Sequence, residues 1–182
     1  QSLILTKPIG TGTLFAAAMR GKAKGPWIDA ALASMQVSQR TAARCLQAHG
    51  ATAATDVTGF GLLGHLVEML SPAQLGATID LAAVPVLDGA LATVAAGIFS
   101  SLQPANLRLR RAVRDAEPFA RDPRFALLFD PQTAGGLLAS VPAERASACI
   151  DALRQSGYPR AANIGTITGH DNGVERIALH AG

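Results

Sequence analysis

One carboxylate, Asp56, precedes a short glycine-rich stretch, and together they could bind a metal ion and a phosphate. Residues 51–57 are small and partly β-branched, which suits a short buried strand, and the leucines after Gly61 recur at helical spacing. The pattern predicts a strand, a tight turn and a helix, with Asp56 where the strand ends. Gly59 and Gly61 free the backbone to turn sharply and let a ligand approach closely. Because a helix N-terminus attracts anions and a carboxylate can bind the Mg²⁺ that accompanies ATP, we expect Asp56 to be a metal ligand.

The same glycines support a second hypothesis, a dinucleotide-binding turn. Gly59, Gly61 and Gly64 have the spacing G-x-G-x-x-G after the expected strand. Asp80 closes the next apolar segment and could hold a ribose. Against this hypothesis, the expected strand lacks the bulky apolar run of a central parallel strand, and Asp56 would repel a pyrophosphate unless a cation intervened. A third interpretation needs no ligand, because the glycines could serve close packing while Asp56 caps the helix.

Other residues with ligand-binding chemistry are isolated in the sequence. Lys7 could contact a phosphate, but a lone lysine at a strand end is expected to be solvated. Cys45 and Cys149 lie far apart in predicted helices, and the four histidines lack the paired spacing of a zinc site. We therefore expect free, buried thiols in a reducing cytoplasm rather than a disulfide or a metal centre. His65 is expected to be a hydrogen-bonded structural residue.

The elements that must position these residues follow one another irregularly. Helices are predicted over residues 11–19, 27–47 in two pieces with Ser38 as a cap between them, 62–70, 87–96, 106–115 and 143–155. Strands are predicted over residues 3–6, 51–57, 77–84, 125–129, 137–141, 161–168 and 174–180, the last two as a hairpin across residues 170–173. Successive helices between Gly12 and Gly50 argue against a doubly wound Rossmann sheet. We predict an α+β fold, a mixed sheet of about six strands covered by helices.

Composition narrows the class of function. The 182 residues are 49% hydrophobic and 16% charged, enough for one globular domain with a substantial core. No apolar run approaches the roughly 18 residues of a membrane span, and no membrane partner is expected. Six arginines between residues 100 and 124, among them Arg110 and Arg114 on one predicted helix face, could bind an anion or a nucleic acid. A net charge of +3 with one Trp and one Tyr favours a solvated basic face instead, so no nucleic-acid partner is expected.

Four segments in order along the chain resemble the signature of one enzyme family. They read DVTGFGLLGH at residues 56–65, LTKPIGTG at 5–12, LFDPQTAGGLL at 128–138 and ANIGTI at 162–167. These segments resemble those of selenophosphate synthetase (selenide, water dikinase), of the aminoimidazole ribonucleotide synthetase-like superfamily. Ala134 departs from the family's usual serine, and Thr166 stands where an acidic residue is common. The resemblance extends over nearly the whole chain.

The resemblance implies that residues 1–182 are a single C-terminal domain. The family's N-terminal half binds ATP and carries a reactive Cys or selenocysteine, a nearby Lys and further Mg²⁺-binding aspartates, and nothing in this sequence resembles it. The complete enzyme converts ATP, selenide and water to selenophosphate, AMP and phosphate with Mg²⁺ and usually K⁺, and it pairs as a homodimer through that half. The expected partner is thus the N-terminal ATP-binding domain.

Within that enzyme the resemblance places Asp56 on the metal and the following turn beside the phosphates. Gly59 and Gly61 would give close backbone approach, and Thr58 would offer a hydroxyl contact. No catalytic nucleophile is expected in this domain, and no turnover is expected from it alone. The alternative is a free-standing dinucleotide-binding module that uses Gly59, Gly61, Gly64 and Asp80.

Overall fold

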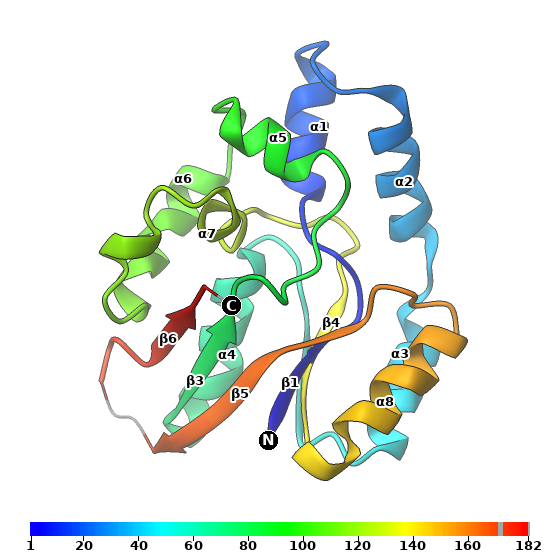
Figure 1. Ribbon diagram of the computed structural model, residues 1–182, viewed down its shortest axis with the longest axis vertical. Coiled ribbons are helices and arrows are strands. Elements are labelled where there is room, and N and C mark those ends of the chain that lie inside the picture. The colour runs from blue at the N-terminus through cyan, green and yellow to red at the C-terminus, as the bar shows by residue number, and fades with distance from the viewer. Residues whose placement is uncertain (171–172, 182) are drawn as a thin grey trace.

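The computed structural model describes residues 1–170 and 173–181, and its centre is one mixed sheet (Figure 1). The described strands are β1 (Ser2–Leu5), β2 (Ala53–Asp56), β3 (Leu75–Asp80), β4 (Leu137–Val141), β5 (Ala162–His170) and β6 (Ile177–His180). They lie in the order β2-β4-β1-β5-β3-β6, and neighbours are antiparallel except for β3 and β6, which are parallel. The predicted α+β fold with a mixed sheet of about six strands is confirmed.

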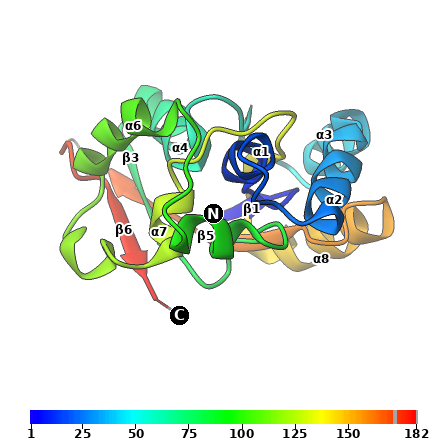
Figure 2. The same cartoon turned by 90° about the horizontal axis from the view of Figure 1, so that it is seen from above.

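Helices cover both faces of the sheet and also lie at one end of its strands (Figures 1 and 2). The α-helices are α1 (Thr11–Met19), α2 (Gly25–Gln36), α3 (Gln39–Ala48), α4 (Gly61–Leu70), α5 (Ala90–Ala95), α6 (Gln103–Asn106), α7 (Pro123–Leu127) and α8 (Ala143–Gln155), and 3₁₀ turns span η1 (Ser71–Ala73), η2 (Leu107–Ala112) and η3 (Glu117–Phe119). Within the described residues, none of these helices combines the length and the apolar character needed to cross a bilayer.

Strand β1 is buried on both faces and separates two parts of the core. Leu3 and Leu5 point to the face that packs against α4, whereas Ile4 points to the face that packs against α3 and α8. Successive side chains of a strand point to opposite faces, so this division follows from the pleat. The four-residue strand therefore joins both core clusters and lies at the centre of the domain.

Chain segments that are far apart in the sequence meet at one end of the sheet, where β1 and β2 finish. Strands β1 and β2 both pair antiparallel with β4, so they run in the same direction and end where β4 begins. The register pairs Asp56 and Leu5 with Leu137 and Leu138, the first two residues of β4. Helices α1, α2 and α5 lie past these strand ends, at the top of Figure 1. The segments that follow β1 and β2 and precede β4 are thus brought together.

Ser38 separates α2 from α3, as the sequence predicted. Its hydroxyl accepts a hydrogen bond from the backbone N–H of Arg40 at 3.3 Å, which is the geometry of an N-cap. The long helical pattern over residues 27–47 is therefore two helices with a break at the expected residue.

The strand predicted over residues 125–129 is wrong, because these residues lie in α7 and the turn after it. Asp122 caps α7 by accepting the N–H of Arg124 at 2.8 Å, and Pro123 occupies the first helical turn. Phe125 and Phe129 pack edge to face at 5.1 Å between ring centroids, as residues four apart on a helical path can. A continuous apolar run of five residues has neither a clear helical nor a clear strand period, which is why its pattern was misleading.

The predicted hairpin of the last two strands is also wrong. Strand β6 pairs in parallel with β3, and β5 lies on the other side of β3, so β5 and β6 are not neighbours. Residues 171 and 172 of the predicted turn lie outside the described residues. Because both strands alternate and turn residues stand between them, a local hairpin and a longer-range pairing have the same sequence pattern.

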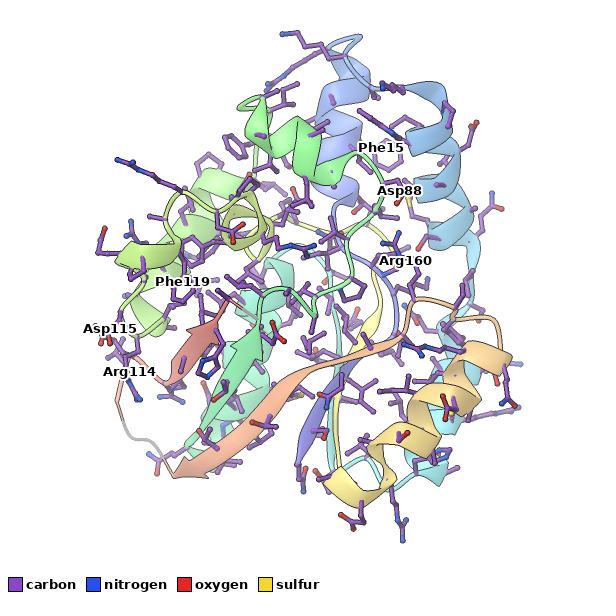
Figure 3. All side chains as sticks on the ribbon, in the orientation of Figure 1. Phe15, Asp88, Arg114, Asp115, Phe119 and Arg160 are labelled. Carbon is purple, nitrogen blue, oxygen red and sulfur yellow. The ribbon has the colours of Figure 1, made fainter. Side chains whose placement is uncertain are left out.

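The helix predicted over residues 106–115 is broken into α6 and the 3₁₀ turn η2. Its arginines are partly engaged in local contacts. Arg110 forms an ion pair with Glu117 at 2.6 Å, and a guanidinium N–H of Arg114 donates to the backbone carbonyl of Glu175 at 3.2 Å. Figure 3 labels Arg114 and Asp115 at the lower left, on the side of the sheet where β6 lies. This segment thus packs along β6 rather than presenting one basic helix face.

Candidate functional site

The carboxamide of Gln132 connects the segment before β4 to the start of α1. Its Oε1 atom accepts the N–H groups of Gly10 at 2.8 Å and Thr11 at 3.1 Å, and the hydroxyl of Thr11 at 3.1 Å. The Thr11 hydroxyl oxygen in turn accepts the N–H of Thr133 at 2.9 Å. Gln132 is buried, so these bonds replace the water that the N–H groups would otherwise need. The resembling segments 5–12 and 128–138 therefore form one hydrogen-bonded unit.

Asp130 is buried completely beside the same helix end. Its Oδ2 atom accepts the N–H of Gly12 and an amide N–H of Gln132, both at 3.0 Å, and a carboxylate is favoured by the positive end of a helix dipole. Its Oδ1 atom has no hydrogen-bond partner among the described residues. Burial raises the pKa of Asp130 to about 7, and the hydrogen bonds from the backbone of α1 and from Gln132 oppose this rise only in part.

The turn after β2 is held against the same segment by backbone hydrogen bonds. The carbonyl of Thr58 accepts the N–H of Gln132 at 2.9 Å, and the N–H of Val57 donates to the carbonyl of Gly136 at 2.8 Å. A Cβ atom on Gly135 would overlap the carbonyl of Val57, so only glycine allows this close approach. The glycine-rich turn is thus fixed in place by the loop before β4.

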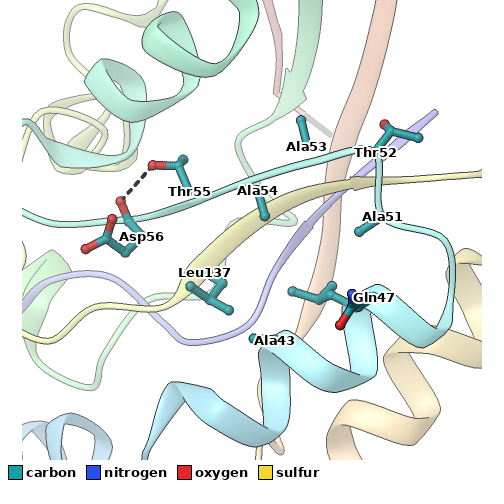
Figure 4. A pocket seen from close by; sticks show the side chains of 10 residues that line it. Ala43, Gln47, Ala51, Thr52, Ala53, Ala54, Thr55, Asp56 and Leu137 are labelled. Carbon is teal, nitrogen blue, oxygen red and sulfur yellow. Dashed lines mark hydrogen bonds between the residues drawn. The ribbon is translucent and has the colours of Figure 1, made fainter.

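Asp56 ends the edge strand β2 with its carboxylate exposed. Across residues 1–170 and 173–181, no hydrogen bond or ion pair reaches this carboxylate. Asp56 does not cap α4, whose N-cap residue is Phe60 without a side-chain hydrogen bond, so the capping interpretation is wrong. Figure 4 shows Asp56 at one end of a groove of about 560 Å³ that runs between β2 and α3. Asp56 is therefore available to an external cation.

The three glycines of the turn have different surroundings. A Cβ atom on Gly59 would meet nothing within 4 Å, so there is open space on that side of the residue, although its carbonyl accepts a hydrogen bond from Asn106 at 2.9 Å. Gly61 has a φ of +71°, and a Cβ atom there would lie 2.9 Å from the backbone of Leu128 and of Phe129. A Cβ atom on Gly64 would lie 2.5 Å from the Cβ atom of Phe60, the N-cap residue of the same helix. Of the three, only Gly59 has room for a ligand.

The first turn of α4 is closed to an anion, contrary to the expectation from the sequence. Its residues are buried, and the N–H groups of Gly61 and Leu63 already donate to the carbonyls of Thr58 and Leu128 at 3.1 and 3.0 Å. A phosphate cannot replace these bonds without displacing the core. Gly61 therefore shapes the turn, whereas Asp56 and Gly59 are exposed.

His65 and Thr58 form a short hydrogen-bonded chain behind the turn. The Thr58 hydroxyl lies 3.1 Å from Nε2 of His65, and Nδ1 of the same ring lies 3.3 Å from Glu68. The ring of Phe60 packs on His65 at 5.6 Å between centroids. His65 is buried and hydrogen-bonded, as expected of a structural residue, and it holds the Thr58 side chain in position.

The structure does not bring the glycine-rich turn and Asp80 together as a dinucleotide-binding site requires. Strand β2 is an edge strand with an antiparallel neighbour, and β4, β1 and β5 lie between it and β3, which carries Asp80. Asp80 accepts the N–H groups of Ala82 at 2.9 Å and Ala83 at 3.3 Å in the turn after β3. A dinucleotide fingerprint needs two adjacent parallel strands, so this alternative is wrong.

Lys7 is buried, so the prediction of a solvated lysine is wrong. Its Nζ atom donates to the carbonyls of Val37 at 2.6 Å and Ala134 at 3.3 Å, and burial lowers its pKa. The amide of Gln39 donates to the carbonyl of Gly135 on the same side. Lys7 thus ties the α2–α3 connection to the loop before β4.

A second group of reactive side chains lies outside this site. Cys45, His49 and Cys149 come together between α3 and α8, although the sequence separates the two cysteines by more than half of the chain. The sequence analysis did not predict this cluster, because long-range helix packing is not visible in residue spacing.

Comparisons with a family model and with individual proteins match most of this chain to one family. The family described as AIR synthase related protein, C-terminal domain, matches residues 1–177. Selenide, water dikinase of Carboxydothermus hydrogenoformans is 39% identical over 93% of this chain and 49% of its own length, and that of Agathobacter rectalis is 42% identical over 90% and 47%. The chain spans about half the length of these curated relatives.

Solved structures share the fold. Hydrogenase maturation protein HypE in complex with ATP superposes with a TM-score of 0.66 at 17% identity, covering 99% of this chain and 47% of that one. Thiamine monophosphate kinase from Aquifex aeolicus gives a TM-score of 0.55 at 15% identity, covering 99% of this chain and 50% of that one.

We predict that Gly61→Ala lowers the free energy of unfolding by about 2–4 kcal/mol, because it combines a left-handed backbone with overlap against fixed backbone atoms. Gly97→Ala is the matched control, since Gly97 has the same φ of +71° but open space around it. It should cost only about 1–2 kcal/mol. Equal losses in urea unfolding of the two variants would contradict the packing explanation.

Asp130 should make stability fall as the pH rises. Its folded pKa of about 7 exceeds the ordinary value of 3.8, so the folded state holds the proton more tightly than the unfolded state. This contribution is complete below about pH 4 and is lost between about pH 4 and 7, with a slope of at most about 1.4 kcal/mol per pH unit. Asp130→Asn should lack this slope when unfolding is measured across that range. Parallel curves for the two proteins would refute it.

Proposed function

The chain belongs to the AIR synthase related protein family as a C-terminal domain, and from this membership we propose that it is part of an ATP-dependent selenide, water dikinase. The proposed reaction of the complete enzyme converts ATP, selenide and water to selenophosphate, AMP and phosphate. The relatives that carry the name selenide, water dikinase support it, since they match over nine-tenths or more of this chain. The complete enzyme would also contain an N-terminal ATP-binding half.

The observation that carries the role of this domain is the exposed carboxylate of Asp56 near the open space at Gly59. A carboxylate oxygen is a preferred ligand of Mg²⁺, and Mg²⁺ in phosphoryl-transfer sites is bound by one or two carboxylates together with phosphate oxygens and water. One unpaired aspartate therefore fits one position of a shared site. It does not fit a metal site that this domain could complete alone, and no residue is assigned to K⁺.

The chain's own groups would act by positioning and by compensating charge. When bound, Mg²⁺ would neutralise negative charge on the transferring phosphoryl group. Asp56 would hold that ion, Gly59 would let the phosphate chain approach the backbone, and Thr58, held in place by His65, would offer a hydroxyl contact. Asp130 and Gln132 would keep this turn rigid from behind. No nucleophile is needed from these residues.

An apolar surface next to Gly59 supports docking of the N-terminal half. A groove of about 540 Å³ contains Gly59 and the Gln132 loop at one end and apolar side chains of α1, α2 and the segment before α6 at the other. Met19 is 84% exposed and Leu102 is 57% exposed on its walls. Exposed apolar groups of this kind mark protein interfaces. The proposed partners are the N-terminal domain and, in the complete enzyme, a second copy of the protein.

The free thiols support a cytoplasmic enzyme. Cys45 and Cys149 are close yet unbonded, as expected in a compartment that keeps thiols reduced.

We predict that Asp56→Ala in the complete protein lowers the rate of ATP-dependent selenophosphate formation by a hundredfold to a thousandfold, the scale of losing one well-placed electrostatic partner. Stability should change by less than about 1 kcal/mol, because the side chain is exposed and no cavity forms. Asp151→Ala, which removes an exposed aspartate on α8, is the matched control and should keep full activity. Near-normal turnover of Asp56→Ala would remove Asp56 from the metal site.

A second prediction concerns this chain without the N-terminal half. Titration calorimetry with Mg²⁺ and ATP should detect no tight stoichiometric binding, because a single carboxylate leaves most of the magnesium shell to water. Adding the N-terminal half should create the site. Tight binding of magnesium-ATP to residues 1–182 alone would contradict a shared site.

A further inference from the structure

Helices α3 and α8 bring three metal-binding side chains together on the face of the sheet opposite α4. Cys45 lies on α3, His49 follows four residues later at the C-cap of the same helix, and Cys149 lies on α8. Residues four apart share a helix face, so Cys45 and His49 both approach α8. One ligand atom from each of the three residues lies within 4.8 Å of the other two. Figure 1 shows the two helices side by side at the lower right.

The distances are close to those of a tetrahedral zinc site. Ligand atoms at the usual Zn–S and Zn–N bond lengths lie about 3.5–3.8 Å apart. The Sγ atom of Cys45 is already 3.7 Å from Nδ1 of His49. Cys149 needs a shift of about 1 Å at most to complete the triangle, which a χ1 adjustment provides. Nδ1 of His49 also lies 2.8 Å from the carbonyl of Cys45, and metal binding through this nitrogen would replace that contact.

The charge of the three ligands suits a buried divalent cation. Cys149 is fully buried, and Cys45 and His49 are partly buried. On coordination each thiol releases its proton to solvent, and two thiolates with a neutral imidazole then balance a charge of +2. The occupied site has no net charge, which avoids the cost of a buried unpaired ion.

We propose that Cys45, His49 and Cys149 bind a thiophilic divalent cation of the Zn²⁺ type, at a site separate from Asp56. Thiolate and imidazole ligands select such ions and exclude Mg²⁺ and K⁺, which prefer oxygen. Cys45 and His49 are partly exposed, which gives the ion an entry path and leaves a fourth position for water. The ion would link α3 to α8 next to the contact that Tyr158 makes with the backbone of Ser38 and Ala42.

The test uses Co²⁺ as a spectroscopic probe and Zn²⁺ as its competitor on the reduced, metal-free chain. Co²⁺ should bind one per chain with a thiolate-to-cobalt charge-transfer band, and Zn²⁺ should displace it and raise the melting temperature. Cys45→Ser should weaken binding by more than the roughly 10–100-fold cost of losing an outer-shell partner. His49→Ala, at a partly exposed helix end, should do the same without opening the core. His180→Ala removes an exposed imidazole elsewhere and should change nothing.

Three results would overturn the proposal. One is the absence of a charge-transfer band in the folded wild-type chain. Another is unchanged affinity in both Cys45→Ser and His49→Ala. The third is a chain that takes up no metal when reduced but forms a Cys45–Cys149 disulfide in air, which would identify the pair as a redox couple instead.

Discussion

The structure depends on the burial of the loop between α7 and β4, whose polar groups all need partners inside the protein. Asp130 and Gln132 find them in the N–H groups at the start of α1, and in return they satisfy donors that no helical carbonyl can reach. The backbone of the same loop bonds to the turn after β2. The hydrogen bonds of this buried network join the three segments and hold them in one arrangement. The position of Asp56 follows from this network.

Much of the fold could be predicted because its signals are local. The helix break at Ser38 and the helix over residues 143–155 have caps or breakers in the sequence, and the buried strands alternate or are continuously apolar. The errors have two causes, a local signal that was overlooked and a pairing that depends on distant residues. Residues 125–129 are apolar on all sides and form a helix because Asp122 and Pro123 start one, a signal that the sequence does contain. The partner of β6 is decided by tertiary packing alone.

The position of Asp56 could be predicted from the sequence, but the hydrogen bonds and packing around it could not. Asp56 stands at a strand end, as expected, because a short strand followed by glycines leaves few alternatives. Spacing alone could not separate Gly59, which faces open space, from Gly61, which packs against backbone. The role of Gln132 could not be inferred either, since a buried glutamine gives no pattern until its acceptor meets the N–H groups before α1. Lys7 was misjudged for the same reason, because its two carbonyl partners lie in other segments.

The place of β1 at the centre of the sheet has a consequence for how the chain folds. Its neighbours on the two sides are β4 and β5, so Leu5 must find Leu138 and Ala162 across most of the sequence. Closing such long loops costs entropy before any packing is gained, and domains rich in distant contacts fold slowly. During synthesis β1 would remain unpaired until β4, about three-quarters of the way along these 182 residues, has emerged from the ribosome. Until that point its apolar residues are exposed, and a chaperone that binds unpaired apolar segments could shield them.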